Sequence, residues 1–200
     1  MTLDSGVPYV TTWTTEQPLP TEVIARPGSG IAYADETLGD RDGNGVLWQR
    51  MASRPGRGRP EFGKVHPLRQ RRAMRRLLCG ICAGPPDRTE QGVLWLVRDF
   101  RNDWPGWPER MAATEPPVCL PCARRSVRVC PALRLGAVAV RVGRSAVAGV
   151  YGVRYQAGNP LPIAVADAVV AFDDPAIGWV CAAQLVRELR DCTVLDWEAV

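Results

Sequence analysis

Two Cys-x-x-Cys pairs are the residues of this 200-residue chain with the clearest chemical potential. Cys79 and Cys82 form the first pair, and Cys119 and Cys122 form the second. Four thiolates at this spacing suit the tetrahedral coordination that Zn²⁺ adopts in structural sites. A shell of four sulfur ligands leaves no position for a reactive water, so the pattern predicts one structural zinc ion. The alternative is that these cysteines are free core thiols or form disulfides.

The composition is typical of a folded protein with many short elements. Apolar residues make up 46% of the chain, and the 19 glycines and 18 prolines predict frequent turns. No apolar run reaches membrane-spanning length, and Met1–Asp4 shows no basic-then-apolar signal. We expect a cytoplasmic protein with no membrane partner. In that compartment paired cysteines favour a metal over a disulfide.

Basic charge is concentrated next to both cysteine pairs. Residues 54–76 carry nine basic side chains and one acidic one, while residues 119–144 carry six arginines and no acidic side chain. A folded metal site would bring the two blocks close together. Such a surface attracts polyanions, and nucleic acid is the first candidate. The alternative is a solvated basic face that is balanced by acidic side chains elsewhere.

Two arginine-rich segments next to the cysteines are expected to be helical. Residues 66–78 can place Leu68 and Met74 on one apolar face, with arginines on another. The segment after Pro121 has no helix breaker, so Cys122 would lie in a first helical turn. The arginines predicted to contact phosphates are Arg69, Arg72, Arg75, Arg76, Arg124, Arg125 and Arg128.

The order of these elements is that of a knuckle, a hairpin and a helix whose first turn supplies the last two ligands. This order resembles the treble-clef zinc finger over residues 66–130, with Gly92–Val97 and Arg110–Val118 as the two hairpin strands. We therefore expect an α+β fold. Small antiparallel hairpins and short helices would surround a treble-clef-like four-cysteine zinc site, and a β/α segment would follow it.

An arginine-rich helix before the first cysteine pair also resembles the layout of HNH nucleases. That family places an Asp-His pair at the end of the first strand, where this chain has Asp99-Phe100. It often has histidine after the last cysteine pair, where this chain has Ala123, and asparagine in the region of Glu115. Without histidine to activate water or hold a catalytic metal, the resemblance implies the scaffold without its chemistry.

Three further regions complete the expected domain organisation. Residues 1–30 are predicted to be an N-terminal arm, because their prolines limit strand pairing. Residues 31–65 are predicted to form a hairpin, with a turn at 42–45, followed by a basic loop. Residues 131–200 are predicted to form a β-hairpin, with a turn near Gly143, and then a helix.

The C-terminal helix is expected to run from Asp174 to about Asp191. Asp174 and Pro175 suit its first positions, and an apolar residue recurs every four positions after them. These apolar residues are Ile177, Cys181, Leu185 and Leu189.

A nine-residue pattern occurs twice in the chain. Asp40–Trp48 and Asp87–Trp95 are identical at six of nine positions, and both end in Gly-Val-Leu-Trp. Either a small unit is duplicated or two hairpins present equivalent strands to one core. Two copies are too few for a solenoid.

These observations favour a zinc-stabilised nucleic-acid-binding protein, with DNA as the preferred partner. One alternative is a non-catalytic module for protein interaction or self-association, and another is a degenerate HNH-like nuclease. No phosphate-binding loop, catalytic triad or dinucleotide fingerprint is found, so we infer no small-molecule substrate and lean against an enzyme. His66, the only histidine, has no evident catalytic partner in the sequence.

Overall fold

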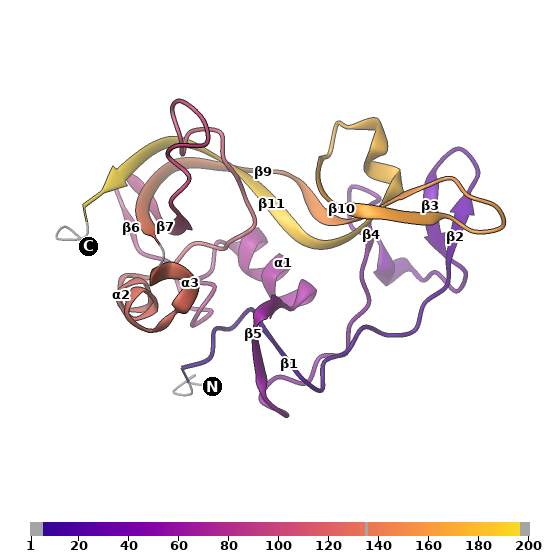
Figure 1. Cartoon of the computed structure of the whole chain (residues 1–200), viewed down its shortest axis with the longest axis horizontal. Helices are drawn as coiled ribbons and strands as arrows, with labels where there is room; N and C mark the ends of the chain where they lie inside the picture. The colour runs from indigo at the N-terminus through magenta and orange to yellow at the C-terminus, as the bar shows by residue number, and fades with distance from the viewer. Residues whose placement is uncertain (1–5, 135, 197–200) are drawn as a thin grey trace. The chain divides into compact units, whose positions relative to one another are not determined.

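A computed structural model describes residues 6–134 and 136–196 and confirms the expected α+β class. The chain divides into two compact units, each assembled from separate segments of sequence. Unit 1 comprises residues 1–10, 68–147 and 187–200, and unit 2 comprises residues 11–67 and 148–186. Two long neighbouring strands, β9 (Ala137–Gln156) and β11 (Val180–Leu195), contribute to both units (Figure 1). Within the described residues, no helix has the length and apolarity needed to cross a membrane.

Unit 1 contains one sheet and the α-helices of the described residues. Its strands follow the order β6 (Arg88–Thr89), β7 (Gly92–Arg98), β9, β11 and β8 (Ala112–Ala113). β6 and β9 both pair antiparallel with β7. The helices are α1 (Pro67–Arg76), whose first residue belongs to unit 2, α2 (Leu120–Val129) and α3 (Pro131–Arg134).

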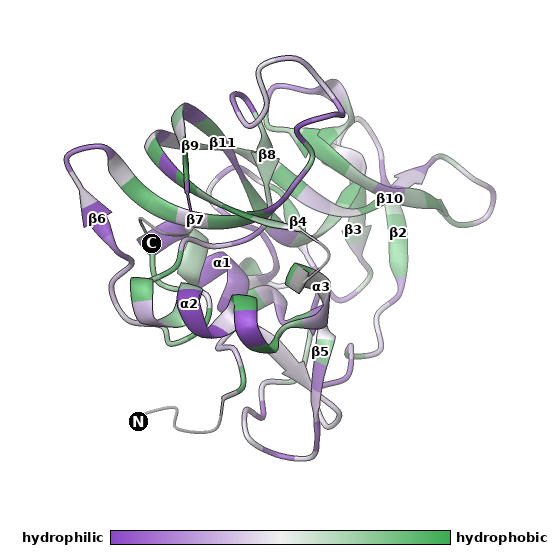
Figure 2. Cartoon of the chain, turned by 60° about the vertical axis from the view of Figure 1, so that its left-hand side comes forward, coloured by the Kyte–Doolittle hydropathy of each residue, from purple (hydrophilic) through white to green (hydrophobic). Residues whose placement is uncertain are grey.

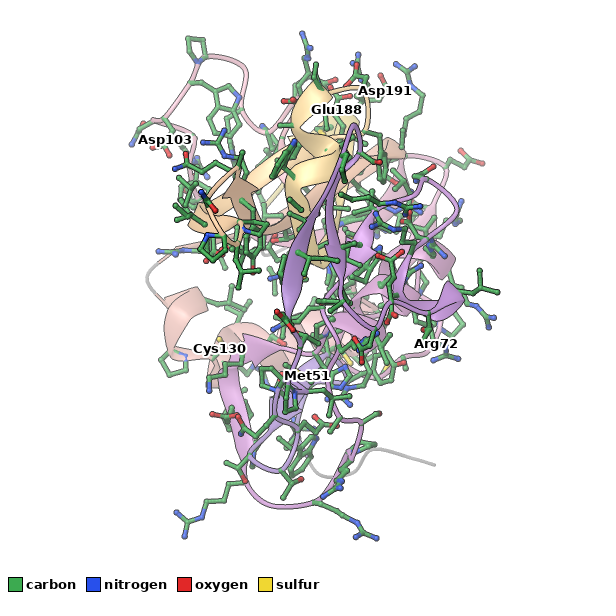
Figure 3. All side chains as sticks on the ribbon, turned by 90° about the vertical axis from the view of Figure 1, so that its right-hand side faces the viewer. Met51, Arg72, Asp103, Cys130, Glu188 and Asp191 are labelled. Carbon is green, nitrogen blue, oxygen red and sulfur yellow. The ribbon has the colours of Figure 1, made fainter. Side chains whose placement is uncertain are left out.

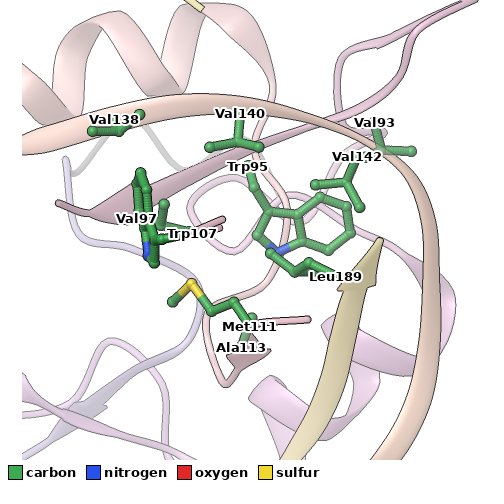
Figure 4. Close-up of a cluster of buried hydrophobic side chains, with 10 residues drawn as sticks. All are labelled: Val93, Trp95, Val97, Trp107, Met111, Ala113, Val138, Val140, Val142 and Leu189. Carbon is green, nitrogen blue, oxygen red and sulfur yellow. The ribbon is translucent and has the colours of Figure 1, made fainter. Parts of the chain in front are cut away.

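Strand β7 is buried on both faces, which is why its sequence is continuously apolar rather than alternating. On one face Val93, Trp95 and Val97 pack in a cluster with Val140 of β9 and Leu189 of β11 (Figure 4). On the other face Leu94 and Leu96 join a second cluster that includes Cys79. The strand thus connects the core of unit 1 directly to the first cysteine pair.

The regular elements of unit 2 are mainly strands, joined by long irregular segments. β10 (Ile163–Ala171) pairs antiparallel with β9, and β4 (Leu47–Trp48) pairs parallel with β11. Two separate antiparallel pairs join β1 (Thr11–Trp13) to β5 (Pro60–Val65) and β2 (Val23–Arg26) to β3 (Gly30–Tyr33). Two 3₁₀ turns, η1 (Leu38–Asp40) and η2 (Pro175–Trp179), complete the unit.

The predicted C-terminal helix is wrong. Residues Pro175–Trp179 form the short turn η2, and Val180–Leu195 form strand β11. An interval of four residues returns to the same face in a strand as well as in a helix, because four is a multiple of the strand period of two. Leu185 and Leu189 are indeed buried on β11, at 1% and 0% exposure. The spacing predicted the buried face and not the backbone conformation.

Several predicted strand pairings are also wrong. Residues 31–34 pair with β2 rather than with residues 46–50, which contain β4. Ala112–Ala113 pairs with β11 rather than with β7. The segment predicted as an N-terminal arm contains strands β1 and β2. Ala112–Ala113 and β1 have partner strands that are distant in sequence, and local turn signals carry no information about such partners, whereas β2 and β3 form a local hairpin.

The predicted turn at Gly143 is wrong as well, because β9 runs through it without interruption. A Cβ atom at Gly143 would lie 3.0 Å from the Cβ atom of Asp191 on β11. The glycine therefore lets the neighbouring strand approach closely, which is a common role of glycine inside a strand.

The two copies of the repeated pattern lie in different units. Asp40–Trp48 belongs to unit 2 and Asp87–Trp95 to unit 1, and both Val-Leu-Trp segments are buried. Trp48 is 3% exposed and Trp95 is 0% exposed. Each copy therefore anchors a tryptophan in its own unit, instead of both contributing to one core.

Candidate metal centre and basic surface

The first cysteine pair lies on a tight knuckle that directly follows α1. The Cys79 N–H donates to the carbonyl oxygen of Gly84 at 2.8 Å, and the Ala83 N–H donates to the carbonyl oxygen of Cys79 at 2.9 Å. Ala83 adopts φ of 59°, in the left-handed region, which closes the turn. These bonds turn the chain back on itself between the two thiols.

The second cysteine pair lies at the start of α2. Cys119 is the N-cap residue, and Cys122 lies in the first helical turn. The partial positive charge at a helix N-terminus favours a thiolate there. The prediction that the second cysteine pair lies at the start of a helix is confirmed.

The four sulfur atoms form one cluster. The Sγ atoms of Cys79, Cys82, Cys119 and Cys122 all lie within 4.8 Å of one another. The Cys82 and Cys119 Sγ atoms are 3.8 Å apart, which is too long for a disulfide bond of about 2.05 Å. A tetrahedral ion with Zn–S bonds of about 2.3 Å would separate its sulfur ligands by about 3.8 Å. The donor set therefore fits a metal ion with tetrahedral thiolate coordination.

The ionisation of the thiols shows why such a cluster needs a cation. Burial raises the pKa of Cys79 to about 11, and burial together with neighbouring thiols raises the pKa of Cys122 further. Burial alone would also raise the pKa of Cys82, but hydrogen bonds from Gly84 and from the adjacent thiols hold it below its usual value. Four thiolates so close together repel one another, and a divalent cation offsets that repulsion.

Backbone hydrogen bonds connect the metal centre to β7. The Val118 N–H donates to the carbonyl oxygen of Leu94 at 2.9 Å, and the Asp87 N–H donates to that of Val118 at 3.0 Å. The Gly80 N–H donates to the carbonyl oxygen of Pro117 at 3.0 Å. Val118 is thereby fixed to the strand and Pro117 to the knuckle, so the strand helps to determine how close the two pairs come.

Helix α1 presents three of the four predicted arginines to solvent. Arg72, Arg75 and Arg76 are exposed, at the i, i+3 and i+4 positions of one face. Figure 3 shows the side chain of Arg72. Arg69, in contrast, is only 7% exposed, while Leu68 is 50% exposed. The helix is thus rotated relative to the predicted faces, and Arg69 does not belong to the exposed basic surface.

Helix α2 presents the other three predicted arginines. Arg124, Arg125 and Arg128 are all exposed, and each of the first two lies within one helical turn of the third. We call these three residues, together with Arg72, Arg75 and Arg76, the arginine surface. All six lie in unit 1, on the two helices that directly precede and follow the cysteine ligands.

A short N-terminal segment, which the sequence analysis missed, touches both helices. The Arg72 guanidinium donates to the Tyr9 hydroxyl at 3.0 Å, and a Cβ atom at Gly6 would lie 2.5 Å from Nη2 of Arg125. The Tyr9 N–H donates to the carbonyl oxygen of Ile81 in the knuckle. Because three residues span at most about 11 Å, Arg72 and Arg125 reach the same narrow strip of chain.

The positions compared with HNH nucleases carry no cluster of catalytic groups. Asp99 forms an ion pair with Arg101 at 2.8 Å, which holds its pKa below the usual value. His66 lies in unit 2, is 0% exposed, and has its Nε2 atom 3.1 Å from the carbonyl oxygen of Ala52. Among the described residues, the four cysteines are the one group arranged to hold a metal ion.

No protein-family model matches the chain, and the searches of curated proteins and of solved structures likewise give no match.

Proposed function

We propose that this protein is a zinc-stabilised nucleic-acid-binding protein. The metal centre would be treble-clef-like: a knuckle, the β6–β7 hairpin, and a helix whose N-terminus supplies the second ligand pair. The zinc would be structural, because four cysteines complete its shell. The arginine surface would contact the phosphate backbone, and DNA is the preferred partner.

The observation that carries this proposal is the position of the arginine surface next to the metal centre. Helix α1 ends three residues before Cys79, and Cys122 lies in the first turn of α2. A bound ion would therefore hold the six guanidinium groups of the two helices in a defined arrangement. The purple stretches of α1 and α2 in Figure 2 mark this hydrophilic surface. Phosphate contacts from arginine supply affinity without reading sequence, so we expect weak sequence preference.

Reversing charge on α1 tests the proposal. We expect Arg72→Glu/Arg76→Glu to weaken binding to a labelled DNA duplex by about tenfold or more. The slope of log Kd against log salt concentration should also fall by about two, because two phosphate contacts are lost. Fluorescence anisotropy at two salt concentrations measures both quantities. The control Arg57→Glu/Arg154→Glu changes two exposed arginines of unit 2 and alters net charge equally. Equal losses in both double variants, or no binding of DNA or RNA at low salt, would refute the proposal.

A second function, self-association, is favoured by the exposed apolar strand β10. Ile163, Val165 and Val169 are 52%, 45% and 52% exposed, and β10 pairs only with β9 among the described strands. Open apolar edge strands recruit further strands.

Lysine at position 169 should prevent such pairing. We expect Val169→Lys to shift the protein toward monomer in analytical ultracentrifugation, because a charged side chain on an edge strand blocks pairing. Leu38→Lys is the matched control, since Leu38 is fully exposed outside β10. If the unaltered protein sediments as a monomer at the highest attainable concentration, this second function is excluded.

A further inference from the structure

Unit 2 contains a cavity of about 330 Å³ that the sequence gave no reason to expect. Its walls come from β3, β9, β10 and β11, together with the segment that precedes β2. This volume lies at the lower end of the range found for sites that bind small molecules. All of the lining residues belong to unit 2.

Strand register places one carboxylate between two aromatic rings. Asp167 of β10 pairs directly with Val153 of β9. Tyr151 and Tyr155 lie two residues to either side of Val153, so their side chains project from the same face of β9. All four residues line the cavity, and burial together with the nearby Asp167 carboxylate raises the pKa of the Tyr151 phenol.

The one basic residue of the described lining, Arg50, is already neutralised. Its guanidinium donates to the carboxylates of Asp40 (2.7 and 2.6 Å) and Asp35 (2.9 and 3.0 Å), and to the Asp35 carbonyl oxygen at 3.0 Å. These contacts involve all three nitrogen atoms of the guanidinium group. The Arg50 guanidinium also stacks over the ring of Tyr33, 4.6 Å from its centroid. It is therefore held in place and is not available to bind an anion.

The floor of the cavity is uncharged at neutral pH. The Tyr33 hydroxyl and the Cys181 Sγ atom are 3.2 Å apart, and burial raises the pKa of both groups. The Asp167 carboxylate is therefore the charge without a cationic neighbour in the lining. A cavity with aromatic walls and a carboxylate at its rim disfavours anions and attracts cations.

We propose that this cavity binds an organic cation, of the ammonium or N-methylated ammonium class. The cation would contact the ring faces of Tyr151 and Tyr155 and the carboxylate of Asp167, as in aromatic cages that recognise quaternary ammonium groups. The site lies in the unit that does not contain the metal centre, and it does not depend on nucleic-acid binding.

A pair of ligands with the same shape tests the role of charge. Choline and 3,3-dimethylbutan-1-ol differ in having nitrogen or carbon at the branched centre, so only choline is cationic. In isothermal titration of the full-length protein, we expect choline to bind roughly tenfold more tightly than the alcohol. Equal affinity of the two ligands, or no detectable binding of choline, would overturn the proposal.

Two substitutions test the residues. We expect Asp167→Asn to weaken choline binding roughly tenfold, and Tyr155→Leu, which keeps an apolar side chain, to weaken it at least about threefold. Asp173→Asn is the matched control, because Asp173 is exposed and does not line the cavity, so choline affinity should not change. Unchanged affinity in a folded Asp167→Asn protein would assign the binding elsewhere. If that variant does not fold, the comparison of the two ligands on the unaltered protein still decides.

Discussion

Replacing Cys119 with serine is expected to remove the metal ion and to unfold the region around it. Serine is a poor ligand for Zn²⁺, and Cys119 both supplies a sulfur atom and caps α2. Zinc binding in small four-ligand sites is worth on the order of 10 kcal/mol of folding free energy. Because whole domains are stable by only about 5–15 kcal/mol, we expect most of the stability of unit 1 to depend on such an ion.

Elemental analysis and thermal melting together measure this effect. The unaltered protein should contain one zinc per chain and should melt at a much lower temperature after treatment with a chelator. Cys119→Ser should contain less metal and melt early without the chelator. Cys130→Ser is the control, since Cys130 lies at the other end of α2 and outside the cluster of four sulfur atoms, so its metal content should not change. Full metal content in Cys119→Ser would exclude the proposed ligand set.

The clustering of the four cysteines was predictable because its signal is local. Each Cys-x-x-Cys pair must form a single turn, and the breaker-free segment after Pro121 fixed the start of α2 to within one residue. What brings the two pairs together is β7, whose Leu94 holds Val118 next to the second pair. The sequence predicted this strand, although it assigned the wrong partner to it.

The aromatic cavity was not predictable, because it depends on strand register. Tyr151 and Tyr155 are visible in the sequence as residues four apart, but nothing local aligns Asp167 with Val153. A shift of one residue would place the carboxylate on the other face of the sheet. Dependence on distant strands also explains why the predicted C-terminal helix was wrong. The partner strands of β11 are distant in sequence, and their contacts override the local preference for a helix.

Replacing Trp95 with alanine should cause the largest loss of stability among core substitutions in unit 1. The side chain is 0% exposed and lies at the centre of the cluster in Figure 4, between β9 and β11. Its Nε1 atom donates to the carbonyl oxygen of Glu115 at 2.9 Å, at the segment that leads to the second cysteine pair. Alanine would leave a cavity and an unsatisfied carbonyl oxygen, at a cost of about 3–5 kcal/mol.

An exposed tryptophan, Trp104, serves as the control, because it shows whether the loss of stability comes from the buried position of Trp95 or from the loss of any tryptophan. Trp104 is 37% exposed in the loop that follows β7, so Trp104→Ala should change the free energy of unfolding by about 0.5 kcal/mol or less. Urea unfolding followed by circular dichroism gives both values, with the metal content held equal. Because Trp95 also positions Glu115, Trp95→Ala should increase the rate at which a chelator removes the metal, whereas Trp104→Ala should not. Similar stability in the two variants would show that the β7 core does not support the metal centre.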